Sequence, residues 1–216
     1  MKKLLLAFAL SLVPFINVSA QPSFETNSSA RSQISLISPE SKVNYTRLQN
    51  LLEKQEWREA NDETYNLLLR ASNRERQGWI TIEDIKKLPC WDLATLDRLW
   101  TTYSNGHFGF TPQLRVFVST GNRPGRLVAI EPYEAFGDQV GWRKNDDWIR
   151  FKENLNYSLD APVGHLPSPR QEYQISGGRL DYVTLAQRIV ECNVVSLPSL
   201  PTSPKPGNQL PKNLPR

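Results

Sequence analysis

The sequence has 216 residues, 39% hydrophobic and 22% charged, which is a globular composition with enough apolar material for one sizeable core. The formal net charge is +4, but removing Lys2 and Lys3 with the leader described below reduces 26 basic residues to 24, against 22 acidic ones. This near balance does not indicate nucleic-acid binding, and one folded domain is expected.

The first 20 residues have the pattern of a secretory signal peptide. Lys2 and Lys3 precede an apolar run from Leu4 to Ile16, and the small residues of VSA precede Gln21. This run is shorter than the roughly 20 residues that span a bilayer and contains Pro14, so an uncleaved anchor is disfavoured. We expect cleavage near Ala20, export, and no membrane span in the mature chain.

Two polar segments flank the expected domain. Residues 21–42 are rich in serine and are interpreted as a linker, and residues 195–216 are rich in proline, which predicts a disordered tail. The folded domain is therefore expected over residues 43–194.

The first half of this domain is predicted to be helical. Apolar residues at helical spacing predict a hairpin of two helices over residues 45–71. The sequence TIED at residues 81–84 predicts a helix cap, and the short helix that follows ends at Pro89. A helix capped by Asp92 is expected to end at Asn105 and Gly106, and the next begins with Thr111 as cap and Pro112 as first residue. HFGF, residues 107–110, connects these two helices.

The second half contains more turns. Alternating apolar residues at 155–159 favour a strand or an extended arm, and a final helix is expected at about residues 179–191. The fold class is therefore mainly α, with long ordered loops, and loops of this length are often functional.

Residue patterns typical of catalysis are scarce. His107 and His165 each lie beside a glycine, and no metalloprotease, serine-hydrolase or phosphate-loop motif is present. The acidic residues are interpreted as helix caps or surface charges (Asp62, Glu63, Asp92, Asp97). Cys90 and Cys192 fit either a disulfide or two buried thiols. We expect a protein that is not an enzyme and holds no metal.

Large aromatic side chains are unusually placed. The tryptophans on or beside the predicted helices are expected in the core (Trp57, Trp79, Trp91, Trp100). Phe108, Phe110, Trp142 and Trp148 instead lie near glycine-containing turns, where either a neighbouring helix or a ligand must cover them.

Six motifs in order resemble the genomes-uncoupled-four family and span about residues 45–192. They are L-x-x-L-L-x-x-x-x-W-x-x-A-N-x-E-T from Leu48, GW at Gly78, LPC-x-DL from Leu88, D-x-LW-x-x-YS-x-G-x-FGF-x-x-Q from Asp97, VGWR from Val140 and AP-x-GHLP from Ala161. The family comprises tetrapyrrole-binding proteins of cyanobacteria and chloroplasts that stimulate magnesium chelatase. The resemblance implies a helical fold shaped like a cupped hand, whose apolar palm holds protoporphyrin IX or its magnesium complex.

A porphyrin is a flat apolar disc with two propionates, so its site requires an apolar face and cations at the rim. With this ligand implied, the expected face comprises Phe108, Phe110, Val140, Trp142 and Leu166. Arg143 and Arg170 are expected to reach the propionates, because a guanidinium matches a carboxylate. His165 is expected to hydrogen-bond within a turn, and neither histidine is assigned as a metal ligand.

The resemblance leaves three functions open. An exported pigment-binding protein, in the periplasm or thylakoid lumen, could buffer or transport a tetrapyrrole. A cytoplasmic chain could instead activate magnesium chelatase as its partner in chlorophyll biosynthesis. A third alternative is a module that has lost the pigment and binds a protein or peptide.

Overall fold

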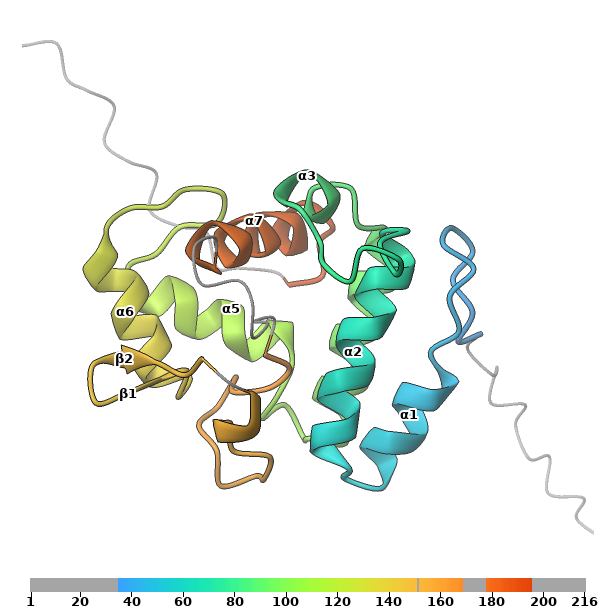
Figure 1. Cartoon of the computed structure of the whole chain (residues 1–216), viewed down its shortest axis with the longest axis horizontal. Helices are drawn as coiled ribbons and strands as arrows, with labels where there is room; N and C mark the ends of the chain where they lie inside the picture. Colours follow the sequence, from blue (N-terminus) through green and yellow to red (C-terminus); the bar gives the residue numbers. More distant parts are fainter. Residues whose placement is uncertain (1–34, 151, 169–177, 196–216) are drawn as a thin grey trace, which may run out of the picture. The chain divides into compact units, whose positions relative to one another are not determined.

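The computed structural model describes residues 35–150, 152–168 and 178–195, with the side chains of residues 178–181 left out. The predicted signal peptide, most of the expected linker, the predicted tail beyond residue 195 and Arg170 lie outside these residues. The described part is mainly α-helical, as the sequence predicts (Figure 1). None of its helices is long and apolar enough to cross a membrane.

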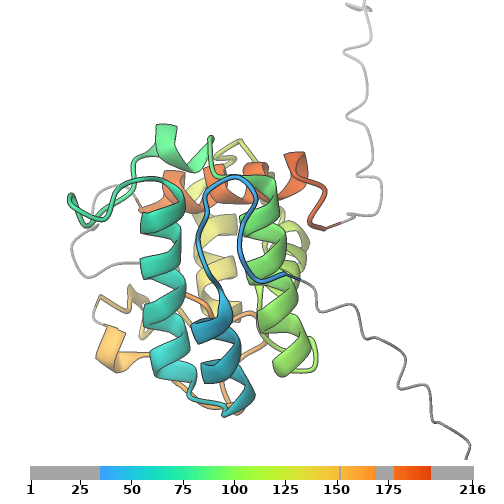
Figure 2. The same cartoon turned by 90° about the vertical axis from the view of Figure 1, so that its right-hand side faces the viewer.

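The helices of the first half occur where the sequence predicts them. Helices α1 (Thr46–Glu53) and α2 (Trp57–Ala71) form the hairpin, and α4 (Cys90–Tyr103) packs beside α1 (Figure 2). Helix α3 (Ile82–Ile85) begins with the predicted capping box of Thr81 and Asp84. The stripe of buried leucines and tryptophans along these helices forms one side of the core.

Two predicted helix caps are wrong. Helix α4 begins at Cys90, so Asp92 lies within its first turn. Helix α5 (Phe110–Ser119) begins one residue before Thr111, after Gly109 at φ 124°. Gly109 suits this conformation because side chains disfavour positive φ, and a Cβ there would lie 2.8 Å from the Thr101 side chain.

The second half contains a helix that the sequence analysis missed. Helix α6 (Ile130–Gln139) carries Pro132 near its start and Gly137 near its end, and these residues favoured a loop prediction. A short antiparallel hairpin follows, with β1 (Arg143–Lys144) paired to β2 (Asp147–Trp148). Residues 155–159 form no strand, whereas a 3-10 turn occupies Lys152–Asn154.

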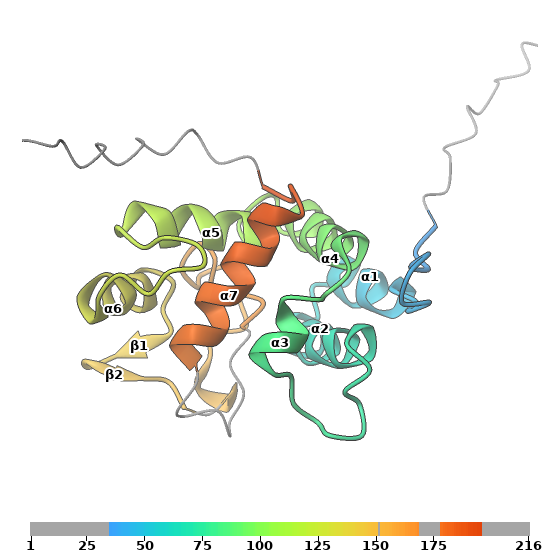
Figure 3. The same cartoon turned by 90° about the horizontal axis from the view of Figure 1, so that it is seen from above.

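Helix α7 (Gly178–Glu191) closes the fold, close to the predicted bounds. Seen from above, it runs between α5 and α6 on one side and α3 on the other (Figure 3). Tyr182 of α7 packs its ring against Phe117, Phe136 and Trp142 at centroid distances of 5.3, 4.7 and 5.5 Å. This aromatic cluster forms the second side of the core.

The folded region begins earlier than residue 43. Residues 35–45 form a hairpin with a bridge between Ile37 and Asn44, and it lies along α4 (Figure 2). The Asp92 carboxylate accepts hydrogen bonds from Ser38, Ser41 and Tyr45 at 2.6–2.7 Å. The expected linker boundary is therefore wrong for residues 35–42.

Candidate functional site

The five apolar residues expected to form a ligand face are all buried, with exposed fractions of 0–1%. Phe108 packs edge-on against Trp57 and Trp100, with ring centroids 5.5 and 6.2 Å apart. Trp142 packs against Phe136 and donates its indole N–H to the His165 carbonyl at 2.8 Å. These side chains therefore lie beneath the surface of the described structure.

The three motifs that carry these residues meet in space. The Gly109 N–H donates to the Leu166 carbonyl and the Gly164 N–H donates to the His107 carbonyl, each at 2.9 Å. These two bonds pair the HFGF turn with the GHLP segment. VGWR joins them through the Trp142 indole.

His165 connects the same segments with both ring nitrogens. Nε2 accepts from the Asn156 N–H at 3.0 Å, so Nδ1 carries the proton and donates to the Val140 carbonyl at 2.7 Å. Burial lowers the pKa of His165 and favours the neutral ring. His165 therefore forms hydrogen bonds with the backbone, as expected, but its partners lie in two other segments and not within its own turn.

Arg143 makes contacts within its own hairpin and with α6. Its guanidinium donates to Asp138 Oδ2 and to the Asp146 carbonyl, both at 2.8 Å, and lies 3.8 Å from Glu134. The side chain is 7% exposed and packs over the Trp148 ring. This arrangement neutralises Arg143 locally, so its expected role toward propionates remains a prediction.

The buried carboxylates fix the fold instead of marking a catalytic centre. Asp97 accepts the Thr111 N–H and hydroxyl at 2.8 and 2.6 Å, and so caps α5 from α4. Burial raises the pKa of Asp97, and the Thr111 hydrogen bonds oppose that change. Glu63, also buried, pairs with Arg47 and Arg70. The predicted capping role holds for Asp97, although its carboxylate is buried, whereas Glu63 and Asp92 are buried and have neither of the two predicted roles. Asp62 pairs with Lys152 near the surface.

A shallow pocket, partly open to solvent and with room for about 10 Å³, roughly one water molecule, lies beside these motifs. One wall comes from α2, and Phe110 and the end of the GHLP segment complete it. The Asn61 side chain accepts the Ser168 N–H at 2.7 Å, which holds that segment against α2. The lining residues are Thr64, Tyr65, Leu68, Phe110, Pro167 and Ser168.

Trp79 does not line this pocket, but the residue before it is hydrogen-bonded to the pocket wall. The Trp79 side chain is 48% exposed. The Tyr65 hydroxyl in the pocket wall donates to the carbonyl of Gly78, the preceding residue, at 2.7 Å. The Arg74 guanidinium stacks over the Trp79 ring, 4.8 Å from its centroid. The prediction of Trp79 as a core residue is wrong, and its position in the polar stretch RERQGW, off the helical stripe, was the available signal.

Comparison with known proteins gives the family. A family model described as GUN4-like matches residues 38–179. The chain belongs to the GUN4-like family. This agrees with the motif resemblance to genomes-uncoupled-four proteins.

Several relatives align with the same region. A Ycf53-like protein of Synechocystis is 30% identical over 127 residues, covering 58% of this chain and 51% of that protein. A chloroplastic tetrapyrrole-binding protein of Arabidopsis thaliana is 28% identical over 135 residues, covering 56% of this chain and 46% of that protein. The chain thus spans about half the length of the curated relatives it matches.

Solved structures support the same fold. GUN4 from Chlamydomonas reinhardtii has a TM-score of 0.57 and 28% identity, with 73% of this chain and 94% of that chain covered. Ligand-free GUN4 of Arabidopsis thaliana has a TM-score of 0.53 and 24% identity, with coverage of 66% and 93%. The second likeness concerns the fold alone.

Proposed function

We propose that this chain binds a tetrapyrrole, protoporphyrin IX or its magnesium complex, without transforming it. The observation that carries the proposal is the pocket floored by Phe110, with the exposed Trp79 ring linked to its wall through Tyr65 and Gly78. Membership of the GUN4-like family and the relative named a tetrapyrrole-binding protein support it.

The chemistry of the pocket suits part of such a ligand. Leu68, Phe110 and Pro167 supply apolar contacts, and Trp79 offers a flat ring for stacking on a macrocycle. The pocket has room for about 10 Å³, far below the roughly 300–1,000 Å³ that small-molecule sites typically enclose. The macrocycle is therefore proposed to stack on Trp79 at the surface, with the pocket receiving at most the tip of one substituent. Arg74 lies on the Trp79 ring and pairs with Asp84 at 3.2 Å through Nε; its terminal nitrogens are the proposed partners of a propionate.

The five buried residues from the family motifs receive an indirect role in this proposal. Phe110 lines the pocket, whereas Phe108, Val140, Trp142 and Leu166 are buried in the core, and their proposed role is to stabilise the segments that carry the pocket. Substituting Trp142 or Phe110 by alanine would therefore create a cavity in the core and confound a binding assay.

The binding test compares Trp79→Ala with the control Ile130→Ala, which truncates a similarly exposed side chain (49%) at the start of α6. Each purified protein is titrated with deuteroporphyrin IX, and the shift of the porphyrin Soret band is followed. We expect saturable micromolar binding for the parent and the control, and at least about tenfold weaker binding for Trp79→Ala, given the weight of stacked aromatic anchors. Absence of saturable binding by the parent would favour the protein- or peptide-binding alternative.

We also propose that the protein acts outside the cytoplasm, where it buffers or transports the pigment. The leader pattern and the disulfide between Cys90 and Cys192 support this, because structural disulfides persist in oxidising compartments. Cell fractionation with mass spectrometry of the amino terminus tests it, with a mature chain beginning near Gln21 expected. A full-length cytoplasmic protein with free thiols would instead support the magnesium-chelatase activator role.

A further inference from the structure

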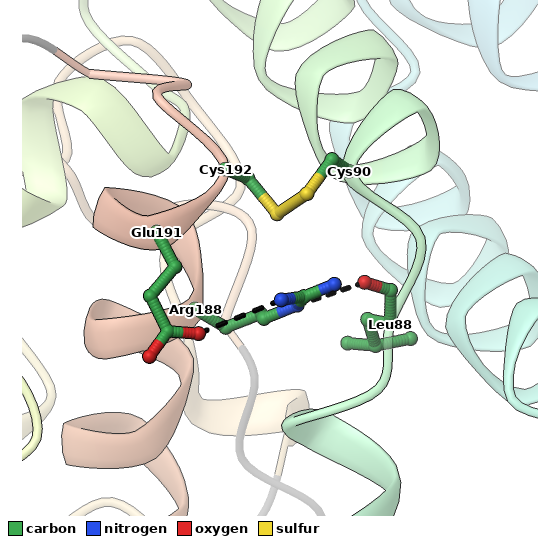
Figure 4. The surroundings of a disulfide bond; sticks show 5 residues. All are labelled: Leu88, Cys90, Arg188, Glu191 and Cys192. Carbon is green, nitrogen blue, oxygen red and sulfur yellow. Dashed lines mark hydrogen bonds and ion pairs between the residues drawn. A yellow bond between two sulfur atoms is a disulfide. The ribbon is translucent and has the colours of Figure 1, made fainter.

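The Cys90–Cys192 disulfide joins two elements that are far apart in the sequence. It links the first residue of α4 to the residue after α7, with a sequence separation of 102 (Figure 4). Arg188 of α7 lies alongside and donates from Nε to the Leu88 carbonyl at 3.0 Å. The end of α7 is therefore tied to residues 88–90 by one covalent bond and one hydrogen bond.

The segment held by these ties continues directly into α3. Helix α3 packs against α7 (Figure 3), and Ile85 and Leu88 are both buried. The GUN4-like family match ends at residue 179, so α7 lies beyond it in all but its first two residues. The disulfide thus fastens a helix outside the matched region onto the family core.

From α3 the contacts lead to the proposed pigment site. Asp84 of α3 accepts hydrogen bonds from Thr81 and forms an ion pair with Arg74 at 3.2 Å. Arg74 stacks on Trp79 and also donates to the Trp79 carbonyl at 3.3 Å. Two contacts, Asp84 with Arg74 and Arg74 with the Trp79 ring, therefore connect α3 to Trp79.

We propose that the Cys90–Cys192 disulfide is a redox-sensitive clasp. It holds α3 and the Trp79 loop, residues 72–81 between α2 and α3, in the geometry that binds the tetrapyrrole. This inference rests on the proposed function. In the oxidised protein the loop is preorganised, whereas in the reduced protein part of the binding free energy is lost in ordering it. The aromatic packing of Tyr182 keeps α7 docked in both states.

The chemical step requires a dithiol reductant. A thiolate of the reductant attacks one sulfur and breaks the S–S bond, and its second thiol then displaces the mixed disulfide. The reductant becomes a cyclic or protein disulfide, and two electrons and two protons end on the thiols of Cys90 and Cys192. Both cysteines are only partly buried, so a reductant can reach them.

The experiment compares the oxidised protein, the same protein reduced with dithiothreitol, and the Cys90→Ser/Cys192→Ser variant. Deuteroporphyrin affinity is measured from the Soret band, and hydrogen exchange is followed over residues 72–90. We expect about fivefold to tenfold weaker binding and faster exchange at residues 72–90 in the reduced protein and in the variant, with helical circular dichroism retained. Dithiothreitol added to the variant should change neither readout, which excludes a direct effect of the reagent.

The outcomes separate this inference from the proposed function. Equal affinity in the two redox states, unchanged exchange at residues 72–90, or global unfolding on reduction would each overturn the clasp. If neither state binds porphyrin, the proposed function fails, while the exchange of residues 72–90 still tests whether the disulfide holds the Trp79 loop.

Discussion

At the scale of single residues, several side chains have a role that their neighbours in space decide. His165 satisfies both ring nitrogens within the GHLP, VGWR and Asn156 segments, and Arg143 satisfies much of its charge with Asp138 and Glu134. Trp79 is the opposite case, since a large aromatic ring remains half-exposed on a well-anchored loop. This exposed ring is the surface feature on which the proposed pigment binding depends.

His165 makes the unfolding free energy depend on pH. Its folded pKa lies below the ordinary 6.5 because the ring is buried, so the unfolded chain binds a proton that the folded protein rejects. The unfolding free energy should therefore fall as the pH decreases below about 6.5. Urea denaturation at pH 7.5 and 5.5 should show a larger loss for the parent than for His165→Gln.

Asp97 does not confound that comparison. Its raised pKa acts in the opposite direction, because a carboxyl that prefers to be protonated in the folded state gains stability as the pH falls. Both proteins contain Asp97, so its contribution cancels in the difference between them. Equal pH dependence of the parent and His165→Gln would contradict the buried neutral assignment of His165.

Substitution of Asp92 tests how strongly this carboxylate holds the 35–45 hairpin in the fold. Its carboxylate accepts three hydroxyl hydrogen bonds from Ser38, Ser41 and Tyr45, and it is fully buried. Asp92→Asn should lower the unfolding free energy by about 2–4 kcal/mol, since buried hydrogen bonds to a charged group are worth about 1.5–3 kcal/mol each. Ser41→Ala, which removes one hydroxyl, should cost clearly less in the same denaturation assay.

Among the helices, most could be predicted from apolar periodicity and capping residues. Helix α6 could not. Tyr133 and Phe136 of α6 are buried at helical spacing, and so is Val140 at its C-cap, but Pro132 and Gly137 concealed that pattern. Pro132 is tolerated because it lies in the first turn, where the backbone N–H has no helical partner. Glycine occurs at position 137 because Trp148 of the following hairpin packs against it.

Gly137 allows the β1–β2 hairpin to lie against α6. A Cβ at this position would lie 2.5 Å from two atoms of the Trp148 ring and 3.0 Å from Arg143 Cδ. Gly137→Ala should therefore destabilise the protein by about 1–2 kcal/mol through overpacking, although alanine is normally the better helix residue.

The matched control adds Trp148→Ala to Gly137→Ala. Relief of the close contact should make the alanine at position 137 neutral or stabilising in that background. If Gly137→Ala is equally destabilising with and without the Trp148 ring, the close approach of hairpin and helix is not its cause. Thermal unfolding followed by circular dichroism measures both effects.

At the scale of the whole molecule, the ends of the fold are fastened by contacts between distant parts of the chain. The 35–45 hairpin is held by Asp92, and α7 is held by Tyr182 packing and by the Cys90–Cys192 disulfide. Two aromatic clusters lie between these fastenings, one around Trp100 and one around Phe136. The family motifs HFGF, VGWR and GHLP join the two clusters.

The disulfide should contribute strongly to global stability. Closing a loop of about a hundred residues restricts the unfolded chain, which corresponds to about 3–5 kcal/mol by loop-closure entropy, for a sequence separation of 102. Cys90→Ser/Cys192→Ser should lose this amount in guanidinium denaturation. The parent measured in dithiothreitol should show the same loss. A loss of unfolding free energy below about 1 kcal/mol, relative to the oxidised parent, would contradict this contribution of the disulfide.

Sequence patterns alone predicted the helical class, the α1–α2 hairpin, the cap of α3 and the final helix, α7. Six ordered motifs also indicated the family. These features depend on residues within a few turns of one another, and periodicity and capping are local properties.

The burial of each aromatic ring, the pairing of each carboxylate and the state of the two cysteines follow from the three-dimensional fold alone. Trp79 and Trp100 both lie in helical or adjacent segments, yet one is half-exposed and the other fully buried. Burial, ion pairing and disulfide formation depend on residues brought together from distant segments. Cys90 and Cys192 meet across 102 positions of sequence, and no local pattern carries that information.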